Sequence, residues 1–182
     1  FHVFLTRHIH GKGMVSSPGN IPLIVLPNNA PSRAYLKIEE AIQRFKPAMT
    51  KGLKVLEMSC ASGGATLAML NRGLDVTGID PLHLDKRVKS TPGFTLIDKE
   101  IHLIVAEDLR SCNPEWLVMD MNIAPLEALD ELTRVVSLLK AVHGKKLSLG
   151  RGFFTIKLND WKFASYIPLY IRRLGQIGFR SL

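Results

Sequence analysis

The feature that most restricts the fold is a regular alternation of short apolar segments with amphipathic ones, beginning near residue 53. Apolar segments with the length of buried strands are Leu53–Met58, Val76–Ile79, Ile101–Val105, Trp116–Met119 and Gly152–Leu158. Segments with helical periodicity between and after them are 63–72, 124–142 and 160–174. Continuous apolar strands that alternate with helices are typical of a mostly parallel sheet covered by helices on both faces. We therefore expect an α/β fold whose ligand binds beyond the carboxyl ends of the strands.

Local signals place the helix boundaries. Ser32 is a plausible N-cap for a helix that ends near Pro47, and Gly73 lies where a left-handed C-cap is wanted. The long helix 124–142 ends at Gly144. Its expected apolar stripe consists of Leu126, Leu129, Leu132, Val136 and Leu139.

The first part of the chain has a different pattern. Residues 2–9 alternate in polarity and residues 23–26 are apolar, so both are expected to be strands. We expect residues 1–28 to be the remnant of a preceding domain or a linker. Residues 29–182 are then expected to form the main domain, which is incomplete after its last helix.

Composition narrows the partners. Lys and Arg number 24 against 16 acidic residues, a net charge of +8, which favours a polyanion such as RNA or DNA. Cys60 and Cys112 lack partner motifs, so we expect neither a disulfide nor a zinc site, and a reducing cytoplasm. His8 and His10 have no acidic or cysteine neighbour, so no metal is expected. No apolar run reaches transmembrane length, so no membrane partner is expected.

A turn of small residues follows the first predicted strand of the sheet. It runs from Glu57 through Ser59, Cys60, Ala61 and Ser62 to Gly63 and Gly64. Small residues allow close approach to a ligand, and the helix N-terminus favours a negative or polar group. The spacing is not G-x-G-x-x-G, so the dinucleotide fingerprint is absent. A plain tight connection between strand and helix explains the turn as well.

Acids follow the next predicted strands. Asp80 ends the second strand at a spacing suited to gripping ribose hydroxyls, and Asp108 follows the expected third strand. Either aspartate alone is equally well explained as a turn or N-cap residue. Together with the small-residue turn, the acids indicate an adenosine site.

Two further charged residues end the last predicted strands. Asp120 closes the fourth strand, and Lys157 closes the fifth after Phe-Phe-Thr-Ile. A lysine at the end of a buried strand needs a partner, and Asp120 is the obvious one. Such a pair serves acid–base chemistry, although a structural ion pair is the alternative. Lys37 belongs to the first predicted helix, where a lysine by itself indicates a solvated face.

Taken together, these motifs resemble the FtsJ-like RNA ribose 2′-O-methyltransferases, in particular the bacterial branch that methylates a cytidine ribose in large-subunit ribosomal RNA. The resemblance covers residues 29–182 and rests on the segment APSRAYLKIEEA around Lys37, the turn 55–64, Asp120 and Lys157. It implies a Rossmann-like fold that uses S-adenosylmethionine. The implied cofactor-binding residues are Glu57, Ser59, Cys60, Ala61, Ser62, Gly63, Gly64, Asp80, Asp108 and Asp120.

The resemblance also implies the catalytic roles. Lys157 accepts the proton of the 2′-hydroxyl, Asp120 orients Lys157, and Lys37 polarises the hydroxyl. A lysine is protonated at neutral pH, so its role as a base requires a lowered pKa or late proton transfer. Basic residues expected to contact RNA phosphates are Arg33, Lys37, Lys46, Lys51, Arg151 and Lys162.

The chain departs from the family pattern at three points. Ser59, Ser62 and Ala65 stand where the family's turn has glycine, proline and tryptophan. The family's fourth catalytic residue, a glutamate on a later strand, has no counterpart. Of the RNA-capturing domain that precedes the family's catalytic domain, only residues 1–26 are expected to remain.

Three other functions are open at this point. A catalytically silent RNA-binding module would keep the fold but lose the cofactor through Ser59 and Ser62. A nicotinamide-dependent oxidoreductase is disfavoured because G-x-G-x-x-G and Tyr-x-x-x-Lys are both absent. A methyltransferase for an mRNA cap or a protein is less favoured, because the set Lys37, Asp120 and Lys157 suits a ribose hydroxyl.

Overall fold

A parallel sheet forms the centre of the computed structural model, which describes residues 23–158 and 160–179. Its strands are β1 (Lys54–Met58), β2 (Asp75–Ile79), β3 (Phe94–Ile97), β4 (Trp116–Met119) and β5 (Arg151–Phe154). They lie in the order β3-β2-β1-β4-β5, and all neighbouring pairs are parallel. The predicted α/β class with a parallel sheet is confirmed.

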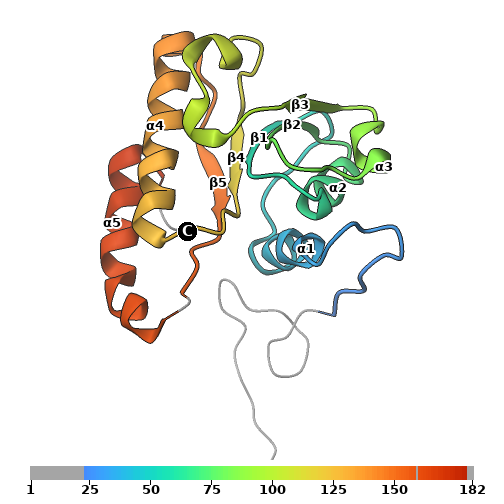
Figure 1. The fold of residues 1–182 in the computed structure, drawn as a ribbon, viewed down its shortest axis with the longest axis horizontal. Coiled ribbons are helices and arrows are strands. Elements are labelled where there is room, and N and C mark those ends of the chain that lie inside the picture. The colour runs from blue at the N-terminus through green and yellow to red at the C-terminus, as the bar shows by residue number, and fades with distance from the viewer. Residues whose placement is uncertain (1–22, 159, 180–182) are drawn as a thin grey trace, which may run out of the picture.

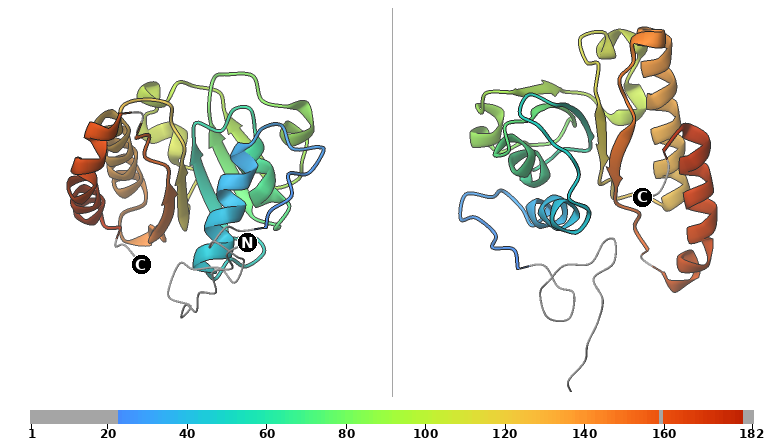
Figure 2. Two further views of the ribbon diagram at one scale, coloured as in Figure 1. Left: turned by 90° about the horizontal axis from the view of Figure 1, so that it is seen from below. Right: turned by 180° about the vertical axis from the view of Figure 1, so that it is seen from behind.

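Helices cover both faces of the sheet (Figures 1 and 2). On one face lie α1 (Ala34–Phe45), α2 (Gly64–Leu70) and the short α3 (Lys86–Lys89). On the other lie α4 (Pro125–His143) and α5 (Ile167–Ile177). Short 3-10 segments occur at Ile101–Leu103, Ala106–Leu109, Gly144–Lys146 and Trp161–Tyr166.

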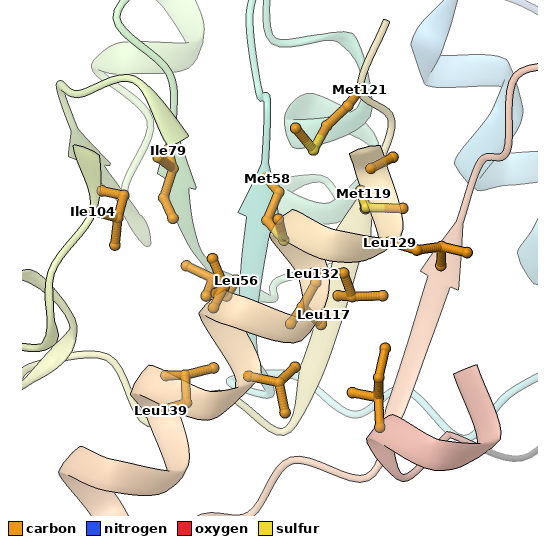
Figure 3. Close-up of a cluster of buried hydrophobic side chains, with 14 of the residues drawn as sticks. Leu56, Met58, Ile79, Ile104, Leu117, Met119, Met121, Leu129, Leu132 and Leu139 are labelled. Carbon is orange, nitrogen blue, oxygen red and sulfur yellow. The ribbon is translucent and has the colours of Figure 1, made fainter. Parts of the chain in front are cut away.

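Two apolar cores result from the period of two along each strand. Leu56 and Met58 of β1, with Leu117 and Met119 of β4, pack against α4, as Figure 3 shows. The intervening residues Val55, Trp116 and Val118 pack against α1 and α2. Glu57 shares this second face, which places a carboxyl group against α2 within an apolar layer.

The order of the strands reverses its direction between β1 and β4. From β1 the chain moves outward to β2 and β3, and then returns to add β4 and β5 on the opposite side. Met58 and Met119 are paired at the carboxyl ends of these two strands, so the segments after them diverge to opposite faces. A crevice at such a switch point is where open α/β sheets bind ligands.

The predicted third strand is wrong. Residues 101–105 form a 3-10 turn and an extended segment outside the sheet, and the third strand is β3 at Phe94–Ile97. The Arg134 guanidinium of α4 donates to the carbonyl groups of Ile101 and Ile104, the groups that a strand would use for pairing. Periodicity alone did not reveal this competing donor.

Smaller corrections concern element ends. Residues 23–26 have no regular structure, and α1 is preceded by Arg33 in helical conformation, without a side-chain cap from Ser32. Leu126 is 44% exposed, because it points away from the sheet, whereas the rest of its predicted stripe is buried. The last helix is divided into a 3-10 turn and α5. The predicted strand at 2–9 lies outside the described residues.

Two further boundaries differ from the prediction. The fifth strand ends at Phe154 rather than at Leu158. The helix α2 ends at Leu70 with Asn71 as its C-cap, so Gly73, with a φ of +74°, lies in the turn beyond the cap. Gly144 follows α4 as predicted. In the part of the chain that the structure describes, no helix has both the length and the apolar character needed to span a bilayer.

Candidate active site

Asp120 lies between two lysines from separate elements. It directly follows β4, and its Oδ2 atom is 2.5 Å from the Nζ atom of Lys37 on α1. Its Oδ1 atom is 2.8 Å from the Nζ atom of Lys157, just beyond β5. The second contact is an ion pair whose angles fall outside those of a hydrogen bond. Three residues distant in sequence therefore meet at one point.

The charges of this cluster fix its protonation. Partial burial alone would raise the pKa of Asp120, but the ammonium groups of Lys157 and Lys37 outweigh it, so this pKa lies below its usual value. The contact with Asp120 raises the pKa of Lys157, against the opposing effect of burial. Asp120 is thus a carboxylate and Lys157 an ammonium ion at neutral pH. The lowered lysine pKa that a resting general base would need is absent from this state.

A cleft of about 260 Å³ opens beside the cluster. It lies between α1 and the ends of β4 and β5. Its lining includes Lys37 and Asp120 together with the apolar side chains of Phe45, Phe153 and Phe154. A polar end and apolar aromatic walls are suited to a planar group that carries a hydroxyl.

The turn after β1 is organised around Asp80. The Oδ2 atom of this buried side chain accepts from the backbone N–H of Ala61 at 2.9 Å and lies 3.4 Å from the hydroxyl of Ser59. Its Oδ1 atom accepts from the N–H of Leu82 at 2.9 Å. Ser59 has a φ of +65°, the left-handed region that the family's glycine suits better. Asp80 therefore joins the turns that follow β1 and β2.

Glu57 lies beneath this turn and is 3% exposed. The hydroxyl of Thr66 on α2 donates to its Oε2 atom at 2.7 Å. Burial raises its pKa to about 8, the Thr66 hydrogen bond opposes the rise, and the negative charges of Asp120 and Asp80 add to it. Glu57 is therefore largely protonated at neutral pH.

The side chains of the turn differ in what they face. Cys60 is 2% exposed and lies in the core against Gly78, where an added Cβ would come within 2.6 Å of its sulfur atom. Its side chain thus faces the core, away from any ligand at the turn. Ser62 is half-buried, and its carbonyl accepts from the N–H of Asp85 at 3.2 Å.

The two glycines of the turn serve helix packing. Gly63 has a φ of +105°, and a Cβ there would touch Val88 of α3 at 3.0 Å. A Cβ on Gly64 would lie 2.7 Å from the carbonyl oxygen of Ser32 and 3.0 Å from the N atom of Tyr35. Gly64 therefore lets the start of α1, which carries Lys37, rest on the start of α2.

Asp108 stands apart from the other acids. It lies in the 3-10 turn Ala106–Leu109 rather than after a strand, because the expected third strand does not form. Its carboxylate accepts from the Nζ atom of Lys99 at 2.6 Å and from the N–H of Val105 at 3.0 Å. These two contacts, the first above all, hold its pKa below the usual value.

The donor set fits a cationic nucleoside such as S-adenosylmethionine. Glu57 lies near the end of β1, and Asp80 and Asp120 directly follow β2 and β4, the strands on either side of it, so that carboxyl groups collect at one edge of a chain that is basic overall. Carboxylates bind ribose hydroxyls and stabilise positive charge. Within the described residues, no group of three or more His, Cys, Asp or Glu side chains is arranged to hold a metal ion.

Sequence reasoning missed two partners in this region. Thr66 is fully buried and donates a hydrogen bond to Glu57. The only feature of the sequence that could have indicated this contact is a hydroxyl residue in the first turn of the helix that follows Glu57. Lys99 pairs with Asp108, and no signal could have found it because the loop conformation brings the two together.

The fold and these contacts together define an α/β domain of Rossmann-like type, with a Lys–Asp–Lys cluster beside an acidic edge at the switch point of the sheet. Comparison with known proteins extends this result. The family model described as FtsJ-like methyltransferase matches residues 30–166. The chain therefore belongs to the FtsJ-like methyltransferase family, and its fold is the Rossmann-like methyltransferase fold.

Individual relatives agree with the family. The chain is 32% identical over 172 residues to the ribosomal RNA large subunit methyltransferase M of Cellvibrio japonicus, with 88% of this chain and 45% of that protein covered. It is 28% identical over 179 residues to the protein of the same name from Alkalilimnicola ehrlichii, again with 45% of that protein covered. The chain spans about half the length of these relatives.

One solved structure supports the fold alone. A protein of Lactococcus lactis, described as a candidate hemolysin, superposes with a TM-score of 0.62 at 18% identity. The superposition covers 84% of this chain and 77% of that one.

Proposed function

We propose that this chain is the catalytic domain of an S-adenosylmethionine-dependent methyltransferase that modifies a ribose 2′-hydroxyl in large-subunit ribosomal RNA. The observation that carries the proposal is the position of Asp120 between Lys37 and Lys157, at 2.5 and 2.8 Å. A hydroxyl must lose a proton as its oxygen attacks, and this cluster offers groups that hold and accept one.

The three residues divide the work as follows. Lys37 is 46% exposed and points into the cleft lining, where its ammonium donates to the 2′-oxygen and fixes its position. Lys157 takes the hydroxyl proton at its Nζ atom, and Asp120 holds Lys157 in place and stabilises its charge. When bound, S-adenosylmethionine supplies a methyl group on a positively charged sulfur atom and leaves as S-adenosylhomocysteine.

Lys157 must become neutral before it can accept the proton of the hydroxyl. In the structure Lys157 is an ammonium ion, because Asp120 raises its pKa. A further positive charge nearby lowers the pKa of a lysine, so a bound cationic cofactor would shift Lys157 towards the neutral form. Lys157 would then give its proton to solvent water before it accepts the one from the hydroxyl.

The cofactor would be held at the acidic edge of the sheet. Asp80 is proposed to bind the ribose hydroxyls, and the backbone of residues 59–64 to line the methionine end. Asp108 is proposed to contact the adenine after Lys99 releases it. Glu57 supports the turn from below through its contact with Thr66.

Ribosomal RNA is the proposed substrate for two reasons. The relatives that match most of the chain are named as ribosomal RNA large subunit methyltransferases. The chain also carries a net charge of +8, which suits a polyanion. Cys60 and Cys112 are buried free thiols, which supports a reducing compartment such as the cytoplasm.

A methyl-transfer assay tests the proposal. The chain is incubated with S-adenosylmethionine bearing a labelled methyl group and with large-subunit ribosomal RNA that carries no 2′-O-methyl groups. We expect label in the RNA at a linkage that then resists alkaline cleavage, since a methylated 2′-oxygen cannot attack the neighbouring phosphate. An RNA with a 2′-deoxyribose at the labelled position should accept no methyl group.

Label in a base, or transfer to the deoxy substrate, would contradict the ribose assignment. If calorimetry detects binding of RNA but none of S-adenosylmethionine, the chain is instead the silent RNA-binding module. Ser59, which has a left-handed backbone conformation, would then be the first residue to replace by glycine in order to restore cofactor binding.

A further inference from the structure

Trp161 is the most exposed large apolar side chain in the described part of the protein. It is 91% exposed, whereas the other tryptophan, Trp116, is 4% exposed. An indole left in water forgoes the stabilisation that burial of so large a side chain provides. Exposed aromatic rings of this kind are suited to stacking on a flat partner.

Hydrogen bonds order the backbone of the turn that carries the indole. The Asp160 carboxylate accepts from the N–H of Lys162 at 2.9 Å, and the Asp160 carbonyl accepts from the N–H of Phe163 at 3.0 Å. The Ser165 hydroxyl closes the same turn on the Lys162 carbonyl at 2.7 Å. Trp161 therefore begins a well-bonded 3-10 turn, and little backbone ordering is needed when a partner binds.

This turn belongs to the same end of the sheet as the Lys–Asp–Lys cluster. Trp161 follows Lys157 by four residues, so their Cα atoms are at most about 14 Å apart. In Figures 1 and 2 the turn and α1 both lie toward the carboxyl ends of β4 and β5. A nucleic acid whose ribose reaches Asp120 thus passes within reach of the indole.

The neighbouring charges suit a nucleic acid. Lys162 is 67% exposed beside the indole, where it pairs with Asp160 at 3.1 Å, and Lys37, paired with Asp120, is 46% exposed on α1. A phosphate can replace these carboxylates as the partner of either exposed ammonium group. Single-stranded nucleic acids are bound by aromatic rings that stack on bases together with cations that contact phosphates.

We infer that Trp161 stacks on a base of single-stranded RNA that flanks the methylated nucleotide. This inference rests on the proposed function, because it takes the RNA strand to lie across the carboxyl ends of β4 and β5. Trp161 would position the strand and would touch neither the reacting hydroxyl nor the cofactor.

Tryptophan fluorescence tests the inference, because Trp161 is the one exposed tryptophan of the two in the sequence. The probe is a short single-stranded RNA of mixed sequence. We expect it to quench the emission of the chain and to protect it from iodide. An oligomer of the same length with abasic ribose units keeps the phosphates but should leave the emission nearly unchanged. The matched variant is Trp161→Phe, which keeps a ring but removes the signal, and RNA should not quench its remaining emission.

Affinity gives a second readout. Trp161→Ala should raise the Kd for the RNA about tenfold, the factor that corresponds to 1.4 kcal/mol, within the range of about 1–3 kcal/mol for one stacked base. Trp161→Phe should recover most of this loss. The Kd for S-adenosylmethionine should be the same in all three proteins, which also shows that the variants are folded.

The outcomes separate the two proposals. Methyl transfer to RNA without quenching, and with an unchanged RNA Kd in Trp161→Ala, would overturn the stacking inference alone. Equal quenching by the abasic oligomer would also overturn it. Base-dependent quenching without methyl transfer would support the stacking and refute the proposed enzyme function.

Discussion

Replacement of Glu57 by glutamine should change how stability depends on pH. Burial raises the pKa of this carboxyl group from 4.5 to about 8, so between these pH values the folded chain keeps a proton that the unfolded chain has lost. Stability therefore falls as pH rises through this window, and the effect is complete above pH 8. The slope is about 1.4 kcal/mol per pH unit, which amounts to about 3 kcal/mol between pH 5 and pH 7.

The variant Glu57→Gln removes this dependence and keeps the local contacts. Its amide oxygen can still accept the hydrogen bond that Thr66 donates at 2.7 Å. When pH rises from 5 to 7, the free energy of unfolding of the original chain should therefore fall by about 3 kcal/mol relative to that of the variant.

Urea unfolding followed by circular dichroism at pH 5, 6 and 7 measures this difference. A second variant, Thr66→Val, removes the hydrogen bond that lowers the Glu57 pKa, so its stability should keep falling above pH 8. If the difference between Glu57→Gln and the original chain were the same at every pH, Glu57 would ionise normally in the folded state. The reasoning from its burial would then be refuted.

Three further predictions concern the site and its support. Lys157→Ala should lower methyl transfer by about a hundredfold or more and leave the calorimetric Kd for S-adenosylmethionine within about twofold; unchanged transfer would remove Lys157 from the mechanism. Asp80→Ala should raise that Kd about tenfold or more, because charged hydrogen bonds contribute about 1.5–3 kcal/mol, and an unchanged Kd would place the cofactor elsewhere. Gly64→Ala should cost about 1–3 kcal/mol in urea unfolding, because the new Cβ meets the Ser32 carbonyl at 2.7 Å. The matched change Gly150→Ala, with nothing within 4 Å, should be close to neutral, and equal costs would contradict the packing argument.

Periodicity was enough to predict the frame of the fold. The apolar runs at β1, β2, β4 and β5 and the stripe of α4 follow from burial on both faces of a parallel sheet. The same reasoning failed at residues 101–105, where the apolar run is as strong but Arg134, about 30 residues later, occupies the carbonyl groups. A long-range hydrogen bond leaves no trace in local sequence pattern.

The candidate site also contains residues that the sequence predicted and contacts that it did not. Residue types and their places at strand ends were enough to propose Asp80, Asp120 and Lys157, since carboxyl ends of parallel strands share one edge. They did not show that Asp108 is engaged by Lys99, or that the Cys60 side chain faces the core. Those contacts depend on loop conformation.

By itself, the sequence determined the class of fold, the order of its main elements and the residue types at the strand ends, because these follow from hydrophobic period and local turn chemistry. Only the tertiary structure decided which charges meet. Lys37 and Lys157 contact the same carboxylate because the order of the strands reverses between β1 and β4, and because Gly64 lets α1 rest on α2. The shifted pKa values of Glu57, Asp120 and Lys157 follow from burial and from the contacts between these charged groups. Neither the burial nor the contacts can be predicted from the residues taken one at a time.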